Sequence, residues 1–551
     1  MKKPYSLSAM QFRQFLCLAF ALAALTASAQ TNVVKTNGIV SARIRPISLR
    51  ECLDLALQRN LDVQIARHSP NAALFELKAA YGSHYDPVLS FGASKGLQTM
   101  PPEQDIKKQN IYSPYELDAT TLDANLSGRL TPGLSYKLGG FSSELSADTH
   151  LLSMFPTTFP PNNTAVGPFL NPALLPPYYT VNGSLFGTWS NATEHYFETQ
   201  YGLQLRQALL KDFWIDAGLM RIQVNKKNLK ISQQSLLMQV MTTTLAVQSA
   251  YYDLIYAHEN VKVMQKALEL AQELLDGDRK RVATGTLAPL GEKLAESQLE
   301  TARANLLAAE QLLEVQRNAL RALLTDDYAQ APEELFDPTD TLTFVWEAPD
   351  RSASLQKALT ARPDIIQARL EVEKQGIVVR YASNQRLPSL DVVGSYGANG
   401  IDDNSREATF AHIGDYSIGL VFRMPLGNTE ARNKYKASKE TQAQLLLHLK
   451  KIEDNILMQL DDVLRSLEKV FKRVGATRQA RIYAEIALEG EKKKLADGAI
   501  TSFMVSEYEN RLAAARTAEI LALVDYNKAL AQLAFNEGST LEKNQIQVEF
   551  K

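Results

Sequence analysis

Side chains that could do chemistry are present in this chain, but their spacing does not match a reactive site. The sequence has no His-Glu-x-x-His motif, which would place two imidazoles on one face of a helix. The histidines are far apart: His68, His84, His150, His195, His258, His412 and His448. Residues 285–293 contain glycines and a lysine but lack the Gly-Lys-Ser/Thr ending of a phosphate-binding loop. With no nucleophile elbow or carboxylate pair, the sequence predicts no enzymatic activity, no metal and no cofactor.

The N-terminus has the three regions of a secretory signal peptide. Lys2, Lys3 and Arg13 are basic, residues 15–25 are apolar, and Ala27-Ser28-Ala29 is a small-residue cleavage site. The apolar stretch is too short to span a membrane as a helix. We therefore expect this segment to be removed and the mature chain to be exported.

Composition limits the function classes further. Removal of the signal peptide would leave Cys52 as the single cysteine, so the mature chain cannot form an internal disulfide. Because free cysteines are usually buried, we expect Cys52 to be a small apolar core residue. The net charge of −2 shows no basic excess, so nucleic acid is not an expected partner. No other stretch reads as a helical membrane span, although strands of a β-barrel would give only a weak period-2 signal.

The chain repeats one pattern twice. Near the start of each copy, Leu53, Ala56 and Leu57 match residues found 302 positions later, namely Leu355, Ala358 and Leu359. In the closing arms the offset is 213, and it relates Gly285 to Gly498. Each copy reads as a short amphipathic helix, a strand, a second strand, a very long helix, a glycine turn and a returning helix. Such a period predicts two similar units packed on each other.

The longest element is a helix of about 64 residues over 215–278, which would measure about 96 Å at 1.5 Å per residue. A seven-residue series of apolar positions runs through it, a pattern typical of a coiled-coil seam. The series consists of Val240, Val247, Leu254, Val261, Leu268 and Leu275. The helix over about 429–490 carries two apolar stripes, which predicts two neighbours, as in a ring of helices.

Alternating residues predict four strands, at 88–94, 196–205, 390–398 and 416–424. Residues 95–198 are rich in proline and aromatic residues, and they are expected to form a long loop or an extra hairpin insertion. The alternation around Thr131-Pro132-Gly133 favours a hairpin at that point.

The expected organisation follows from these elements. It comprises a signal peptide (1–29), a loose N-terminus (30–47), a first repeat (48–325), a linker (326–350), a second repeat (351–538) and a loose C-terminal tail (539–551).

In order and spacing, these features resemble the TolC-like outer-membrane efflux channel family. The resemblance covers about 48–538. It rests on the paired openings, on Pro87 and Pro388 before strands, on the run Gln204-x-Arg206-Gln207-Ala208-Leu209-Leu210, and on the tips Thr284-Gly285-Thr286-Leu287 and Asp497-Gly498-Ala499-Ile500.

The resemblance implies a mixed fold and a homotrimer. Each protomer would contribute four strands to a twelve-stranded transmembrane β-barrel, with the helices forming a coiled-coil α-barrel across the periplasm. It also implies a periplasmic adaptor protein, an inner-membrane pump and outer-membrane lipid as partners. The residues implied to contact the adaptor are Thr284, Gly285, Thr286, Leu287, Gly498, Ala499 and Ile500. Glu507 and Glu292 are the candidates for a pore constriction, although Met504 departs from an acidic position of the family.

The leading hypothesis is therefore a passive outer-membrane channel that gives a tripartite efflux or type I secretion system its exit duct. The alternative is a periplasmic coiled-coil adaptor or structural protein, which would explain the long helices but not the alternating runs. The simpler interpretation of Gly285 and Gly498 is that they only form the turns. The simpler interpretation of Glu507 and Glu292 is that they are solvated residues on a helix surface. The cargo does not follow from the sequence.

Overall fold

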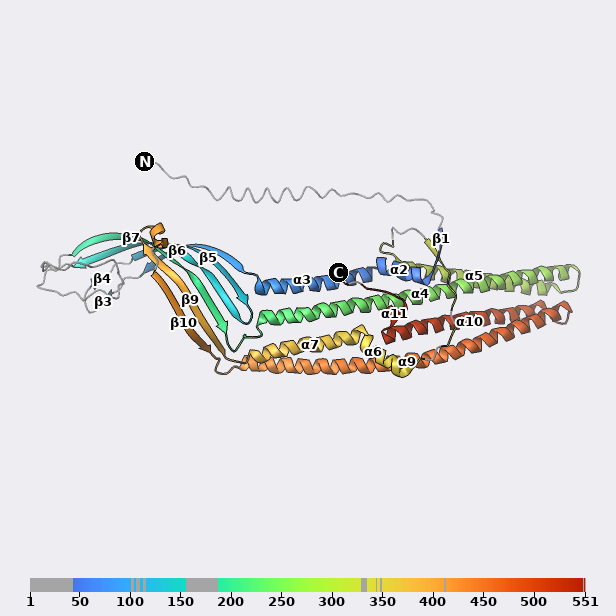
Figure 1. Ribbon diagram of the computed structural model, residues 1–551. Helices are drawn as coiled ribbons and strands as arrows, with labels where there is room; N and C mark the ends of the chain where they lie inside the picture. Colours follow the sequence, from blue (N-terminus) through green and yellow to red (C-terminus); the bar gives the residue numbers. More distant parts are fainter. Residues whose placement is uncertain are drawn as a thin grey trace, which may run out of the picture.

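The computed structural model is an elongated molecule with a β-sheet at one end and long helices that extend to the other (Figure 1). It describes residues 43–100, 104–105, 110–111, 115–154, 187–328, 334–342, 344–346, 349–410, 413–548 and 550. The predicted signal peptide lies outside these residues.

Two long helical hairpins form the body. Helix α4 (Ala217–Ala283) has 67 residues and α9 (Thr429–Ala496) has 68, so each measures about 100 Å. They are followed by the returning helices α5 (Pro289–Leu324) and α10 (Ser502–Glu537). Val240, Val247 and Leu254 of the seven-residue series are almost fully buried, which confirms that the series forms a packing seam.

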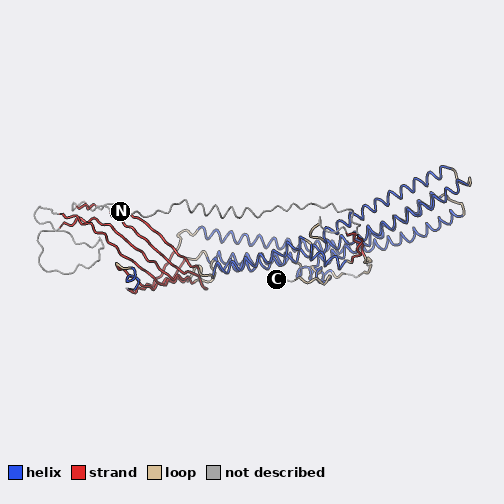
Figure 2. The backbone as a smooth tube through the Cα atoms, turned by 90° about the horizontal axis from the view of Figure 1, so that it is seen from above, coloured by secondary structure: helices blue, strands red, loops and turns tan. Residues whose placement is uncertain are grey.

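Shorter helices extend the two hairpins toward the sheet. In the first half these are α2 (Leu49–Arg59) and α3 (Leu61–Tyr85), and in the second half α6 (Arg351–Ala361) and α7 (Pro363–Asn384). Helix α3 packs on α4, and α7 packs on both α4 and α9, so that four helices run side by side into the sheet (Figures 1 and 2). Cys52 of α2 is fully buried, as predicted, and burial raises the pKa of its thiol to about 12.

The main sheet has six strands in the order β10-β9-β7-β6-β5-β2, all antiparallel. The prediction of four strands per protomer is therefore wrong. The expected four are present as β2, β7, β9 and β10, and β5 and β6 are inserted between β2 and β7. The bounds are β2 Val88–Met100, β5 Tyr115–Leu130, β6 Leu134–Met154, β7 Gly187–Ala208, β9 Ser389–Asp402 and β10 Ile413–Arg423.

The added strands are those of the hairpin predicted around Thr131-Pro132-Gly133. Leu130 pairs with Leu134, so these three residues form its turn, as expected. Two short strands, β3 (Gln104–Asp105) and β4 (Asn110–Ile111), pair with each other in the same region. In the second half, the short helix α8 (Ser405–Phe410) follows β9.

The ends of the chain are more structured than predicted. Strand β1 (Arg43–Ile47) lies in the expected loose N-terminus and pairs in parallel with β8 (Glu334–Pro338) of the expected linker. After Gly538, helix α11 (Thr540–Lys543) forms, and Ile546 and Val548 pack against α3 and α4. The prediction of a loose tail is wrong for this part, because these apolar residues cover an apolar patch on the long helices.

Among the residues described, no helix has a stretch that is both apolar and long enough to cross a membrane.

Candidate functional site

The first candidate site is the loop between α4 and α5, at the end of the molecule farthest from the sheet (Figure 1). Gly285 adopts a left-handed φ of 74°, and its amide donates to the carbonyl of Val282 at 3.0 Å. The amide and hydroxyl of Thr286 both donate to the carbonyl of Arg281, at 2.9 and 3.0 Å. These bonds satisfy the last carbonyls of α4, as a left-handed helix cap does. Thr284, Gly285 and Thr286 remain exposed, and Leu287 is half-buried.

The second loop, between α9 and α10, has nearly the same geometry. Gly498 has a φ of 71°, and the amide of Ala499 donates to the carbonyl of Lys494 at 2.9 Å. Gly498 and Ala499 are exposed, whereas Ile500 packs against a small core between α9 and α10. An added Cβ on either Gly285 or Gly498 would meet open space, so the glycines are needed for backbone conformation rather than for close packing.

Two exposed apolar side chains lie beside these loops, and the sequence reasoning missed them. Leu290 is 70% exposed at the start of α5, and Phe503 is 48% exposed at the start of α10. They are separated by the same 213-residue offset that relates the two glycines, which is the signal that could have identified them. Each loop therefore presents an exposed turn next to a large exposed apolar side chain, an arrangement typical of a contact surface.

The structure places each of the two glutamates predicted at the pore next to an arginine of its own hairpin. Nε of Arg279 donates to Glu292 at 3.3 Å, and Nε of Arg511 donates to Glu507 at 3.2 Å. Both glutamates lie on the returning helices close to the loops. Because each carboxylate has a cationic neighbour, repulsion within a ring of such glutamates would be smaller than for isolated charges.

Two polar contacts join the hairpins to each other near the loops. The hydroxyl of Ser502 in α10 donates to the carboxylate of Asp278 in α4, which is only 2% exposed. Nη2 of Arg281 donates to the carbonyl of Leu495 at 3.1 Å. A hollow of about 330 Å³ next to them is lined by residues of α4, α9 and α10, including Gly277. The contact surface between the hairpins is therefore polar and incompletely filled at this end.

Glu509 is a buried carboxylate two residues beyond Glu507 in α10. Burial raises the pKa of Glu509 above its ordinary value, while Lys492 and Arg516 act in the opposite direction. Its counterpart in the first half, Glu296, is ion-paired with Lys293 and Arg279, and hydrogen bonds from these two groups lower its pKa. The two hairpins thus differ chemically at matching positions.

The second candidate site is the sheet, because its two faces differ in polarity. Register places the side chains of Leu89, Leu126 and Leu138 on one face, and those of Ser90, Asn125 and Lys137 on the other. The first face carries large apolar side chains on every strand. They include Leu89, Phe91, Leu122, Leu130, Leu138, Tyr201, Leu205, Tyr396, Ile418, Leu420 and Phe422.

The opposite face is polar and hollowed. A row of glycines crosses three neighbouring strands at Gly139, Gly202 and Gly397, which are register partners. A Cβ added to any of them would lie within 2.8 Å of the backbone of a neighbouring strand, which only glycine permits. A hollow of about 390 Å³ is lined by these glycines and by polar side chains such as Asp123 and Gln200. Close backbone approach of this kind marks a bend in a sheet.

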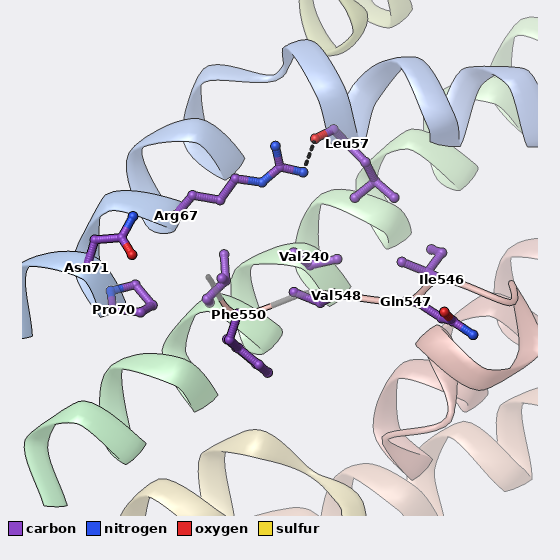
Figure 3. Close-up of a pocket in the computed structure, with 10 residues that line it drawn as sticks. Leu57, Arg67, Pro70, Asn71, Val240, Ile546, Gln547, Val548 and Phe550 are labelled. Atoms are coloured by element: carbon purple, nitrogen blue, oxygen red, sulfur yellow. Dashed lines mark hydrogen bonds between the residues drawn. The ribbon is translucent and has the colours of Figure 1, made fainter. Parts of the chain in front are cut away.

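One further hollow, of about 430 Å³, lies between α3, α4 and the C-terminal segment (Figure 3). Its walls are mainly apolar, with Val240, Ile546 and Val548 on one side, and Nη2 of Arg67 is already bonded to the carbonyl of Leu57 at 2.9 Å. Within the described parts of the chain, no three His, Cys, Asp or Glu side chains gather as a metal site. This hollow carries no reactive group.

Comparison with known proteins identifies relatives of the chain. A family model described as "Outer membrane efflux protein" matches residues 180–325 and 354–539. The outer membrane efflux protein BepC of Brucella suis is 23% identical over 341 residues, covering 60% of this chain and 70% of that protein. The cobalt-zinc-cadmium resistance protein CzcC of Cupriavidus metallidurans is 26% identical over 220 residues, covering 38% of this chain and 48% of that protein. Strands β5 and β6 lie outside the matched family residues.

The fold has a solved counterpart. The crystal structure of the CmeC outer membrane channel of Campylobacter jejuni superposes with a TM-score of 0.60 at 15% sequence identity, covering 89% of this chain and 86% of that chain. The superposition covers 89% of this chain, so it includes parts of both the sheet and the helical body.

Proposed function

The chain belongs to the outer membrane efflux protein family, and on that premise we propose that three copies of it form one continuous exit duct. The protein is located in the outer membrane and extends into the periplasm. Its relatives are channels rather than enzymes. In the proposed trimer, the sheets join as a barrel in the membrane, and the helices form a tube below it.

One observation carries this proposal: a sheet that is apolar on one face, polar on the other and open at both edges continues directly into helices of about 100 Å. In lipid an open edge leaves backbone groups without partners, so a single protomer cannot remain as it is. Closure with further copies satisfies the edges of β2 and β10 and leaves a polar lumen. A periplasmic adaptor protein, the alternative function, would have no use for such a sheet.

The two loops are the proposed docking points for a periplasmic adaptor, which would connect the duct to an inner-membrane pump. This part of the proposal is supported by the exposure of Thr284, Gly285, Gly498 and Ala499 next to apolar side chains. Transport through the duct would be passive and driven by that pump. We also propose that the two halves arose by duplication, since α2 to α5 and α6 to α10 follow the same order.

Gating is proposed to occur where the hairpins meet. The Asp278–Ser502 and Arg281–Leu495 contacts hold α4 close to α9 and α10, so their rupture would let the loops separate. Glu507 and Glu292, near the loops, would then set the charge of the opening. Three copies of each would favour cations, moderated by the neighbouring arginines.

The central test is assembly and conductance. Mature protein purified in detergent should sediment as a trimer and conduct ions in planar bilayers. A monomer without conductance would overturn the proposal. Adaptor docking is tested separately with Leu290→Asp and Phe503→Asp, which should weaken capture of the cognate adaptor while conductance is retained. Leu307→Asp, an exposed position farther along α5, serves as the control for a charge on the same helix.

A further inference from the structure

The hairpin of β5 and β6 is a full part of the sheet rather than a decoration of it. Strand β5 pairs with β2 from Val88↔Ser127 to Met100↔Tyr115, and β6 pairs with β7 from Leu134↔Gln207 to Met154↔Gly187. Backbone hydrogen bonds therefore run without a break across all six strands. A hairpin lying over the sheet or beside it would leave β2 and β7 to pair with each other, which they do not.

The hairpin also follows the polarity of its neighbours. On β5 the apolar face carries Leu122, Leu126 and Leu130, and the polar face carries Thr121, Asp123 and Asn125. Leu122 and Leu126 lie opposite Ala93 and Leu89 of β2, and Thr121 and Asn125 lie opposite Ser94 and Ser90. A strand that presents leucines to one side and acids or amides to the other has the alternation of a barrel wall between lipid and water.

The turn of the hairpin is fixed at the boundary between the sheet and the helices. The amide of Ala208 donates to the carbonyl of Gly133 at 3.2 Å, and Nε2 of Gln207 donates to the carbonyl of Pro132 at 2.6 Å. A Cβ on Gly133 would lie 2.8 Å from the carbonyl oxygen of Asp212. The hairpin thus reaches the same depth as β7 and spans the full height of the wall.

The free edges permit closure with this larger number of strands. Strands β2 and β10 are at the two ends of the sheet, and because alternate strands reverse direction, they run oppositely to each other. Strand β10 of one protomer can therefore pair antiparallel with β2 of the next. Bacterial barrels of this type contain even numbers of antiparallel strands, a condition that six strands per copy satisfy.

Building on the trimer put forward above, we propose that the membrane barrel has eighteen strands rather than twelve and that it exports bulky cargo. With strands about 4.8 Å apart and tilted by about 40°, the barrel radius is about 18 Å for eighteen strands and about 12 Å for twelve. Side chains occupy about 5 Å of that radius. The open radius is then about 13 Å instead of about 7 Å.

The larger barrel matches the width of the helical tube. Each protomer sends four helices into the sheet, so three protomers give a ring of twelve (Figure 1). Helix axes spaced about 9 Å apart place that ring at a radius of about 17 Å. An eighteen-stranded wall therefore continues the tube at almost constant width, whereas a twelve-stranded wall would narrow it. Cargo as wide as the tube can then cross the membrane.

The strand count is tested by electron cryomicroscopy of the full mature protein in detergent or nanodiscs. The expected result is a trimer with eighteen strands in the wall, including β5 and β6. A trimer with a twelve-stranded wall and the hairpin outside it would overturn this inference and leave the channel function intact. The absence of a trimer would instead overturn the function proposed above.

Cargo width is tested in planar bilayers with neutral polyethylene glycols of graded size added on the external side. Polymers with a hydrated radius up to about 13 Å should enter and lower the conductance. The matched variant replaces residues 101–186 by a four-residue Gly-Ser loop, which joins β2 to β7 directly. Its cut-off should fall to about 7 Å. Equal cut-offs in the two trimers would refute the proposed gain in width.

Discussion

The contact between Asp278 and Ser502 provides the sharpest test of the gating proposal. Asp278 is 2% exposed, and the Ser502 hydroxyl donates to its carboxylate across the boundary between the hairpins. A hydrogen bond to a charged group contributes about 1.5–3 kcal/mol. If opening separates α4 from α10, Asp278→Ala should increase the ratio of open to closed tips by about 10- to 150-fold per protomer.

The assay is single-channel recording of trimers in planar bilayers at fixed potential. Asp278→Ala and Ser502→Ala should each raise the open fraction, and the double variant should add little to the effect of either, because both remove the same bond. Asp276→Ala is the control, since Asp276 lies exposed two residues before Asp278 and is bonded within its own helix, to Nε2 of Gln272 at 3.1 Å and to Arg279 at 4.0 Å. Intact Asp278→Ala trimers with wild-type opening would refute the reasoning.

Three other predictions concern stability. Glu509→Gln should remove a pH dependence of stability. Burial makes the folded state hold the proton of the Glu509 carboxyl more tightly than the unfolded state does, so the wild-type free energy of unfolding should fall as pH rises above about 4.5. Urea titrations at pH 4.5 and 7.5 should reveal this loss only in the wild type. Gly498→Ala should lower the free energy of unfolding by about 1 kcal/mol, because alanine is strained at a left-handed φ. Gly475→Ala within α9 should raise it by about 0.5–1 kcal/mol, because alanine is the better helix former and meets open space there. Melting temperatures that shift in the same direction would contradict this contrast. Removal of residues 546–551 should lower the free energy of unfolding by about 2 kcal/mol, because Ile546 and Val548 pack on α3 and α4. The effect is modest since both side chains are only partly buried there. An unchanged melting temperature would show that this packing is dispensable.

Sequence reasoning was most reliable where one physical period dominates. The heptad from Val240 to Leu275 predicted a buried seam, because apolar residues repeated every seven positions keep one side of the helix in contact with its neighbour. Gly285 and Gly498 marked the loops because a left-handed cap demands glycine. The turn at Thr131-Pro132-Gly133 was located for a similar local reason.

What the sequence did not reveal depends on distant partners. Strands β5 and β6 alternate only moderately, and their membership in the sheet is determined by pairing with β2 and β7, which no local pattern encodes. Asp278 stands in the charged run Asp276-Gly277-Asp278-Arg279, so it reads as a surface residue until α10 packs over it. The C-terminal residues gained structure for the same reason, because the apolar patch they cover is contributed by α3 and α4.

The open edges of the sheet have a genetic consequence. In the proposed trimer every copy supplies its own β10 to one neighbour and its β2 to the other, so one damaged edge breaks a seam that two healthy subunits cannot repair. An allele with a defective β2 should therefore be dominant when it is expressed together with the wild type. A cell carrying both alleles would lose most of its export capacity, rather than half.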